Sequence, residues 1–179
     1  ALSGVTSSVA SNQGVLTKVY FPRMILPLAS LGAGLVEVGI QLVIFIFFMM
    51  YYQIAPSLLM LALPGFILLA LLTALGFGIW LTALNVKYRD IGMAVPFLIQ
   101  IWMYLCPIVY PITLVPERVR TFYALTPMVG VIEGFRWSLL GTASPDWQAI
   151  GVSIIAMSII LISGLYYFRR SESWFADVI

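Results

Sequence analysis

The sequence predicts an all-α integral membrane protein, because its composition and its long uncharged stretches suit lipid rather than water. Of its 179 residues, 62% are hydrophobic and only 9% are charged, and the mean hydropathy is +1.06. Soluble domains carry roughly 25% charged residues, so this chain has too few charges to cover a water-facing surface. Its length has room for one such domain, residues 1–179.

Four stretches are long enough to cross a bilayer, whose core takes about 20 apolar residues as a helix. They cover about residues 30–52, 57–84, 91–110 and 147–168. Residues 111–145 differ, because they hold four prolines and five charged residues between short apolar runs. This segment predicts two short re-entrant helices, about residues 116–125 and 128–140, whose backbone ends need protein or water around them.

Basic residues in the short connections set the orientation of these spans. They precede the first span, separate the second from the third and follow the fourth: Lys18 and Arg23, Lys87 and Arg89, Arg169 and Arg170. All three pairs can therefore face the cytoplasm, while the uncharged "YYQIAPS" and residues 111–145 face the other side. We expect both ends of the chain in the cytoplasm, with residues 169–179 as a cytoplasmic tail.

No catalytic or metal-binding constellation is visible. The chain has no His and a single cysteine, Cys106, which removes His-based triads, most metal sites and an intramolecular disulfide. No phosphate-binding glycine loop is present, so a nucleotide that drove transport would bind another chain. A net charge of +2 is too small for a nucleic-acid surface. We expect no catalytic residue, metal or nucleic acid.

Two polar features lie inside the predicted spans, where burial in lipid is costly. Glu37 either lines a hydrophilic cavity or pairs with a basic residue of another helix, or it reaches the inner headgroups from a shallow position. One face of the third span combines an amide, a phenol and prolines at helical spacing: Gln100, Met103, Tyr104, Pro107 and Pro111. That face suits a sugar, although a kinked helix packing its polar face on neighbours is the simpler interpretation.

Small residues recur every four positions in the first two spans. They are Ser30 and Gly34, Ala29 and Ala33, and Ala70, Ala74 and Gly78. This spacing lets helix backbones approach closely in a membrane. The contact is either within one bundle, the simpler interpretation, or with a second copy of the chain.

Four segments carry motifs in a fixed order along the chain. They are "NQGVLTKVYFPRMILPLAS" (residues 12–30), "LNVKYRDIG" (84–92), "TPMVGVIEGFRWSLLG" (126–141) and "YFRRSESWFADVI" (167–179). In this order they resemble the entry to the third helix, the cytoplasmic loop between helices four and five, the re-entrant region and the C-terminal end of polysaccharide-exporting ABC-2 permeases. The resemblance implies the fold of an ABC-2 exporter transmembrane domain.

Two departures from that family stand out. The family has six transmembrane helices and an amphipathic N-terminal helix, whereas four spans are predicted here. The chain therefore resembles the C-terminal two-thirds of such a permease, with residues 1–15 as the end of the second helix or the connection after it. Thr126 stands where the family has Asn.

The resemblance implies a homodimer whose channel is driven by two cytoplasmic ATPase subunits, which bind ATP and Mg²⁺ in place of any cofactor here. Residues 12–29 would be a coupling segment and residues 85–92 a coupling loop. The contacts with the ATPase would come from Lys18, Tyr20, Phe21, Arg23, Lys87, Tyr88, Arg89 and Asp90. The alternative is that these charges only set the orientation, and both roles can coexist.

On the same resemblance, residues 111–145 form an extracytoplasmic gate. Glu133 and Arg136, three residues apart on a helix, suit an ion pair, although Arg136 could instead meet a phosphate or acidic group of the cargo. The channel-lining candidates are Glu37, Gln100, Tyr104 and Tyr110.

The implied function is the permease of an exporter that moves a lipid-linked polysaccharide across the bacterial inner membrane. The alternatives are an ABC-2 permease for a drug or lipid, and a membrane anchor subunit that transports nothing.

Overall fold

A computed structural model describes residues 1–12, 24–53, 58–88, 90–108, 123, 125–141 and 145–178, with side chains up to Ser171. Within these residues the chain forms helices and no strands. They are α1 (Leu2–Ser11), α3 (Ile25–Tyr51), the 3-10 helix η1 (Leu58–Ala62), α4 (Leu63–Lys87), α5 (Asp90–Leu105), α7 (Pro127–Leu140) and α8 (Trp147–Val178). The predicted all-α membrane class is confirmed.

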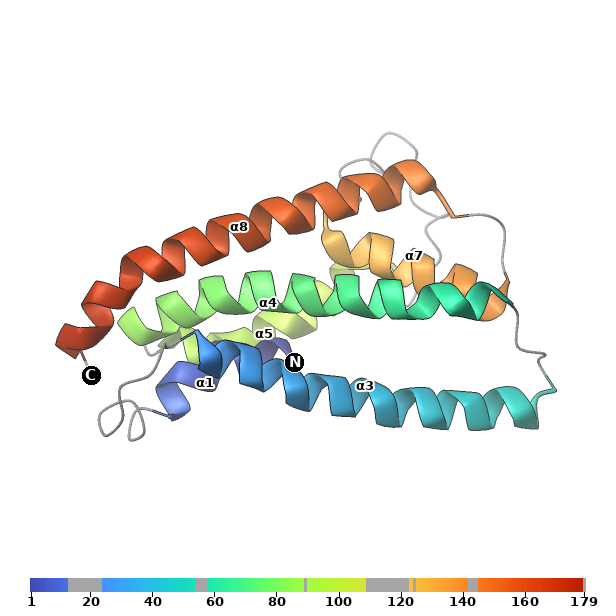
Figure 1. The fold of residues 1–179 in the computed structure, drawn as a ribbon, viewed down its shortest axis with the longest axis horizontal. Helices are drawn as coiled ribbons and strands as arrows, with labels where there is room; N and C mark the ends of the chain where they lie inside the picture. The colour runs from blue at the N-terminus through green and yellow to red at the C-terminus, as the bar shows by residue number, and fades with distance from the viewer. Residues whose placement is uncertain are drawn as a thin grey trace.

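The long helices α3, α4 and α8 run along the length of the molecule, and the shorter helices pack around them (Figure 1). Helices α1 and α5 lie toward the end where α4 finishes, and α7 lies between α4 and α8 toward the opposite end (Figure 1). Helix α4 is the centre of the bundle, since it packs on α1, α3, α5, α7 and α8.

Three helical segments are long and apolar enough to cross a membrane: Ile25–Tyr51, Leu58–Lys87 and Trp147–Ser171. They correspond to the first, second and fourth predicted spans. The first begins about five residues earlier than predicted, and α8 continues through most of the predicted cytoplasmic tail.

The prediction that the third span covers residues 91–110 is wrong in length. Helix α5 has 16 residues and ends at Leu105, so it extends only about 24 Å at 1.5 Å per residue. The cause is Pro107, which has no N–H to donate and whose ring clashes with the carbonyl four residues back. Residues 106–108 form a tight turn instead, with the Ile108 N–H donating to the Cys106 carbonyl at 2.7 Å. Residues 109–110 lie outside the described residues.

Glycines allow the closest helix crossings around α4. A Cβ on Gly164 of α8 would lie 2.9 Å from the carbonyl oxygen of Gly76. A Cβ on Gly78 would overlap the Val5 side chain of α1. Gly78 therefore serves a contact within the bundle, the simpler of the two interpretations, whereas Ala29 and Ala33 are exposed.

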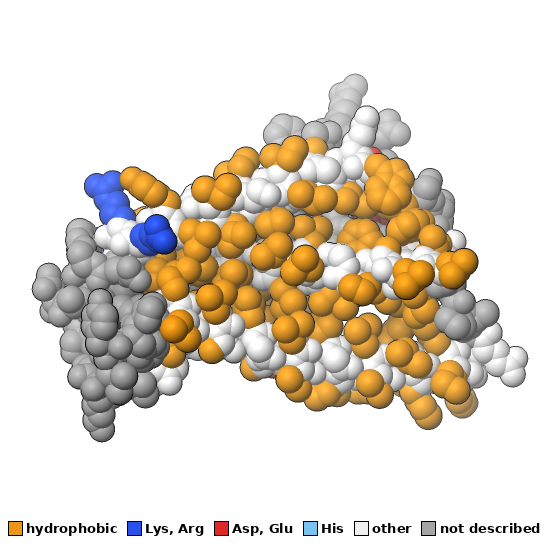
Figure 2. All heavy atoms as spheres, viewed as in Figure 1, with side chains coloured by type: hydrophobic (Ala, Val, Ile, Leu, Met, Phe, Trp, Pro, Cys, Tyr) orange, Lys and Arg blue, Asp and Glu red, His pale blue; other side chains and the backbone are white. Residues whose placement is uncertain are grey.

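The two ends of the bundle differ in charge. Lys87, Arg169 and Arg170 are exposed at one end, here called the basic end, where Figure 2 shows blue side chains beyond the apolar surface. Trp80 stacks on Tyr167 near it, with ring centres 4.7 Å apart. The opposite end has its own aromatic groups, including exposed Tyr51, Tyr52 and Trp147. Aromatic side chains at both ends are typical of the two membrane interfaces.

Candidate functional site

Of the residues assigned to ATPase coupling, the structure brings three together at the basic end. Lys87, Tyr88 and Asp90 are all exposed and are here called the corner. The Lys87 ammonium lies 5.2 Å from the centre of the Tyr88 ring, a cation–π distance. The remaining candidates lie outside the described residues: Lys18, Tyr20, Phe21, Arg23 and Arg89. The coupling role stays a prediction for all eight.

Backbone geometry explains how the sequence makes this corner. Helix α4 ends where Tyr88 adopts an extended conformation, with its N–H donating to the Leu84 carbonyl at 2.8 Å. Helix α5 begins at Asp90, whose carboxylate suits the positive end of the helix dipole. The positive-inside pattern gave no reason for an acidic residue here, and the start of α5 gives Asp90 a local structural role.

A buried polar contact lies just inside the same end. The Thr82 hydroxyl lies 2.8 Å from the Val5 carbonyl of α1 and 2.6 Å from the Gly78 carbonyl of its own helix. The Asn85 amide donates to the Thr6 carbonyl at 3.3 Å. Sequence reasoning missed both residues. The available signal was a Thr and an Asn three positions apart, at the end of an otherwise apolar span.

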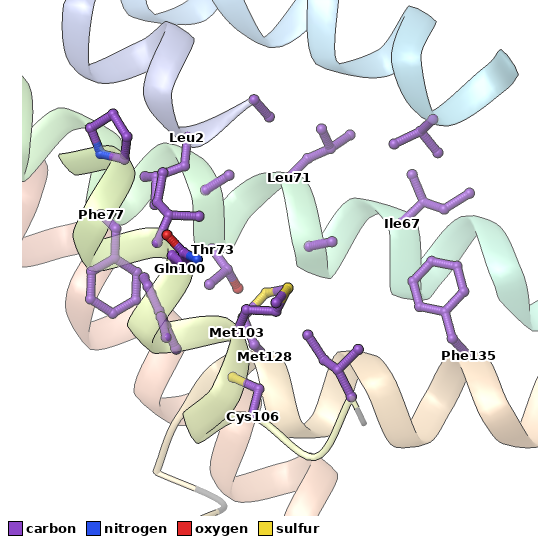
Figure 3. A pocket seen from close by; sticks show the side chains of 18 residues that line it. Leu2, Ile67, Leu71, Thr73, Phe77, Gln100, Met103, Cys106, Met128 and Phe135 are labelled. Carbon is purple, nitrogen blue, oxygen red and sulfur yellow. The ribbon is translucent and has the colours of Figure 1, made fainter. Parts of the chain in front are cut away.

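A cavity of about 530 Å³ lies between α1, α3, α4, α5 and α7 (Figure 3). Its wall is mostly aliphatic and aromatic. Leu2, Leu71, Phe77, Met103 and Phe135 are among the lining residues. Gln100 adds an amide, and Thr73 adds a hydroxyl that already donates to the Leu69 carbonyl at 2.8 Å.

The four channel-lining candidates do not meet in one place. Gln100 lines the cavity together with Met103 from the same helix (Figure 3). Tyr104 is 61% exposed and is not among the described lining residues. Glu37 is exposed on α3. Tyr110 lies outside the described residues, and the channel role stays a prediction for all four.

The predicted ion pair between Glu133 and Arg136 is present, with Nη1 and Oε1 3.3 Å apart. Arg136 also donates from Nη2 to the Ile108 carbonyl at 3.1 Å. Since Ile108 lines the cavity, Arg136 fastens part of the cavity wall to α7. Their role as a gate stays a prediction. The other expected re-entrant helix, about residues 116–125, falls almost wholly outside the described residues.

Two glycines let α7 pack closely against α8 and α4. The Gly130 N–H donates to the Ser153 hydroxyl of α8 at 3.2 Å, and a Cβ at Gly130 would lie 2.6 Å from the Ser153 Cβ. A Cβ on Gly134 would overlap the Phe66 ring of α4. Thr126, at the position where the family has Asn, is the N-cap and makes no side-chain capping bond.

The described residues offer surfaces and a cavity rather than reacting groups. Among them, no three His, Cys, Asp or Glu side chains lie together in a way that could hold a metal ion. Cys106 is a buried free thiol beside the cavity.

Comparison with known proteins gives one family and several relatives. The family described as ABC-2 type transporter matches residues 1–140. The chain is similar to the O-antigen export system permease protein RfbA of Myxococcus xanthus, at 28% identity over 177 residues, which is 96% of this chain and 68% of that protein. Two proteins of the same name from Klebsiella pneumoniae are 25% and 23% identical in alignments of 181 positions, gaps included, that cover 99% of this chain and 70% of each relative.

Proposed function

Because the chain belongs to the ABC-2 type transporter family, we propose that it is the permease subunit of an exporter for a lipid-linked polysaccharide in the bacterial inner membrane. The observation that carries the proposal is the extent of the similarity. Three relatives named as O-antigen export permeases align over 96% to 99% of the chain, so the likeness is not confined to one apolar span.

The energy for export comes from separate ATP-binding subunits, which hold ATP and Mg²⁺. They dock at the basic end, which faces the cytoplasm by the positive-inside rule. The corner residues Lys87, Tyr88 and Asp90 are exposed there and offer an ammonium group close to an aromatic ring, together with a carboxylate. The remaining contacts come from Lys18, Tyr20, Phe21, Arg23 and Arg89. Two copies of the permease form the channel.

Helix α5 supplies part of the channel wall, with Gln100 as the donor and acceptor for sugar hydroxyls and Tyr104 as a stacking surface. Tyr110, beyond the end of α5 in the sequence, is a second stacking candidate. Glu37 lines the same route from α3. Glu133 and Arg136 control its outer end, since Arg136 holds the turn that follows α5.

One observation favours a second candidate, an ABC-2 permease that exports a lipid or drug. The cavity between the helices is mostly apolar, and hydrocarbon suits such a wall better than a hydrated sugar does. The two candidates differ in the cargo that requires the permease.

Deletion of the gene for the complete permease from its own bacterium tests the proposal. We expect the lipid-linked polymer to accumulate inside the cell and to disappear from the surface, and a plasmid copy of the gene to reverse both changes. Unchanged surface polysaccharide together with lost efflux of a lipid or drug would favour the second candidate. No change in either cargo would favour an anchor subunit that transports nothing.

A further inference from the structure

Three helices meet in one buried polar contact at the basic end. It consists of the side chains of Thr82 and Asn85, the carbonyls of Val5 and Thr6, and Gly92, and is here called the polar joint. Thr82 is fully buried and Asn85 is 5% exposed, so water has little access to these hydrogen bonds. Buried polar groups in such a setting keep their partners, because separation leaves them unsatisfied.

The joint binds α1 to α4 through two neighbouring carbonyls rather than one. The single Thr82 hydroxyl proton is shared between the Val5 carbonyl at 2.8 Å and the Gly78 carbonyl of its own helix at 2.6 Å. One turn later on α4, the Asn85 amide donates to the Thr6 carbonyl at 3.3 Å. Two bonds at successive positions resist both sliding and rotation of α1 along α4. The absence of a side chain at Gly78 lets Val5 come close enough for the first bond.

Gly92 brings α5 into the same contact. A Cβ at this position would lie 2.7 Å from the Asn85 Oδ1, so a side chain here would force the Asn85 amide to shift. Asn85 is therefore held between α1 on one side and the first turn of α5 on the other.

The joint is also close in the sequence to both segments expected to contact the ATPase. Asn85 is two residues before the corner residue Lys87, within the same continuous helix. Helix α1 ends at Ser11, directly before the stretch that holds Lys18 and Arg23. A link between α1 and α4 at this level is therefore a link between both coupling segments.

We propose that Thr82 and Asn85 are positioning residues that make α1 and the corner move as one unit when the ATPase pushes on the corner. The inference rests on the proposed function for its driving force. The physical link itself needs no cargo and no nucleotide.

The first arm of the test measures that link in the full-length permease in lipid nanodiscs. Spin labels at Ser7→Cys on α1 and Met93→Cys on α5, both exposed positions, report the distance between the two helices. We expect a narrow distance distribution, and a broad one in the double variant Thr82→Val with Asn85→Leu. Ser163→Ala removes a hydroxyl bonded only within α8 and should leave the distribution narrow. A narrow distribution in the double variant would overturn the proposal.

The second arm measures transport and ATP hydrolysis by the permease with its ATPase. We expect the double variant to hydrolyse ATP while the cargo moved per ATP falls about fivefold or more, the usual range of coupling between sites. The single variant Thr82→Ser, which keeps the hydroxyl and leaves Asn85 unchanged, should keep most of the wild-type ratio of cargo moved per ATP hydrolysed. If ATP hydrolysis and transport fell together in the double variant, and Thr82→Ser lost as much of both, the positioning role would be overturned. If no ATPase binds the wild-type chain, the proposed function fails, and the distance measurement still decides whether the joint exists.

Discussion

At the scale of single residues, Thr82, Asn85 and Arg136 each join two parts of the chain by donating to a backbone carbonyl. Hydrogen bonds between helices in a membrane contribute about 0.6 kcal/mol on average and about 1.7 kcal/mol at most. Each bond therefore sets the relative position of the two segments that it joins and adds little to the free energy of unfolding. Their partners could not be read from the sequence, because carbonyl acceptors have no residue signature and Val5 and Thr82 are 77 positions apart.

The close contact at Gly78 gives the first prediction. Gly78→Ala should lower the free energy of unfolding by about 1–3 kcal/mol, because the new methyl group overlaps Val5 in a packed contact. Gly39→Ala is the matched control, since a Cβ there meets nothing within 4 Å. It should be neutral or stabilising by up to about 1 kcal/mol, the helix-propensity gain. Unfolding in detergent micelles measures both, and equal effects would contradict the close contact.

Arg136 gives the second prediction. Arg136→Ala removes both its ion pair and its bond to Ile108, and should cost about 1–2 kcal/mol because the side chain is only 28% exposed. Glu133→Gln removes only the ion pair and should cost less, within the 0–1 kcal/mol of partly exposed pairs. The midpoint of thermal unfolding ranks the two variants. A larger loss for Glu133→Gln would show that the Ile108 bond contributes little.

At the scale of elements, hydropathy located three of the four predicted spans and failed for the third, which ends before Pro107. The stretches that became α3, α4 and α8 were predicted as spans from hydropathy. The prediction for α5 ran on to residue 110, because counting apolar residues gave no weight to Pro107. Helix α1 was harder still. Its ten residues are rich in Ser, and its packing against α4 is a tertiary contact that sequence periodicity does not reveal.

The corner between α4 and α5 gives the third prediction. Charge reversal by Lys87→Glu with Asp90→Lys should weaken co-purification of the ATPase subunit, because the pattern of charge offered to the partner is inverted while the net charge is unchanged. Arg170→Glu is the control, since it changes charge at the same end outside the corner. Equal retention of the ATPase by both variants would mean that these charges serve orientation only.

At the scale of the whole molecule, the arrangement of charge and aromatic residues matches a protein that crosses the membrane with its basic end on one side. Composition predicted this membrane-crossing arrangement well, because lipid favours apolar residues along the whole length of a span. The cavity and the polar joint could not be predicted, since both depend on which helix faces meet. Gln100 reached the cavity as the helical spacing suggested, whereas Tyr104 on the next turn is exposed.

Orientation gives the fourth prediction. A cysteine replacing exposed Tyr51 should react with a membrane-impermeant maleimide added to intact spheroplasts, because the positive-inside rule places that end outside the cell. A cysteine replacing Arg170 should react only after the membrane is permeabilised. The reverse pattern would invert the assignment of the basic end.

ATP-driven transport by the purified complex tests whether the permease exports a lipid-linked polysaccharide. Proteoliposomes would hold the full-length permease, its ATPase subunit and a lipid-linked polysaccharide, with the appearance of polymer on the opposite leaflet as the measured quantity. We expect transport that requires ATP and stops when the ATPase cannot hydrolyse it. If a lipid without polymer crossed the membrane while the lipid-linked polysaccharide did not, the permease would not be a polysaccharide exporter.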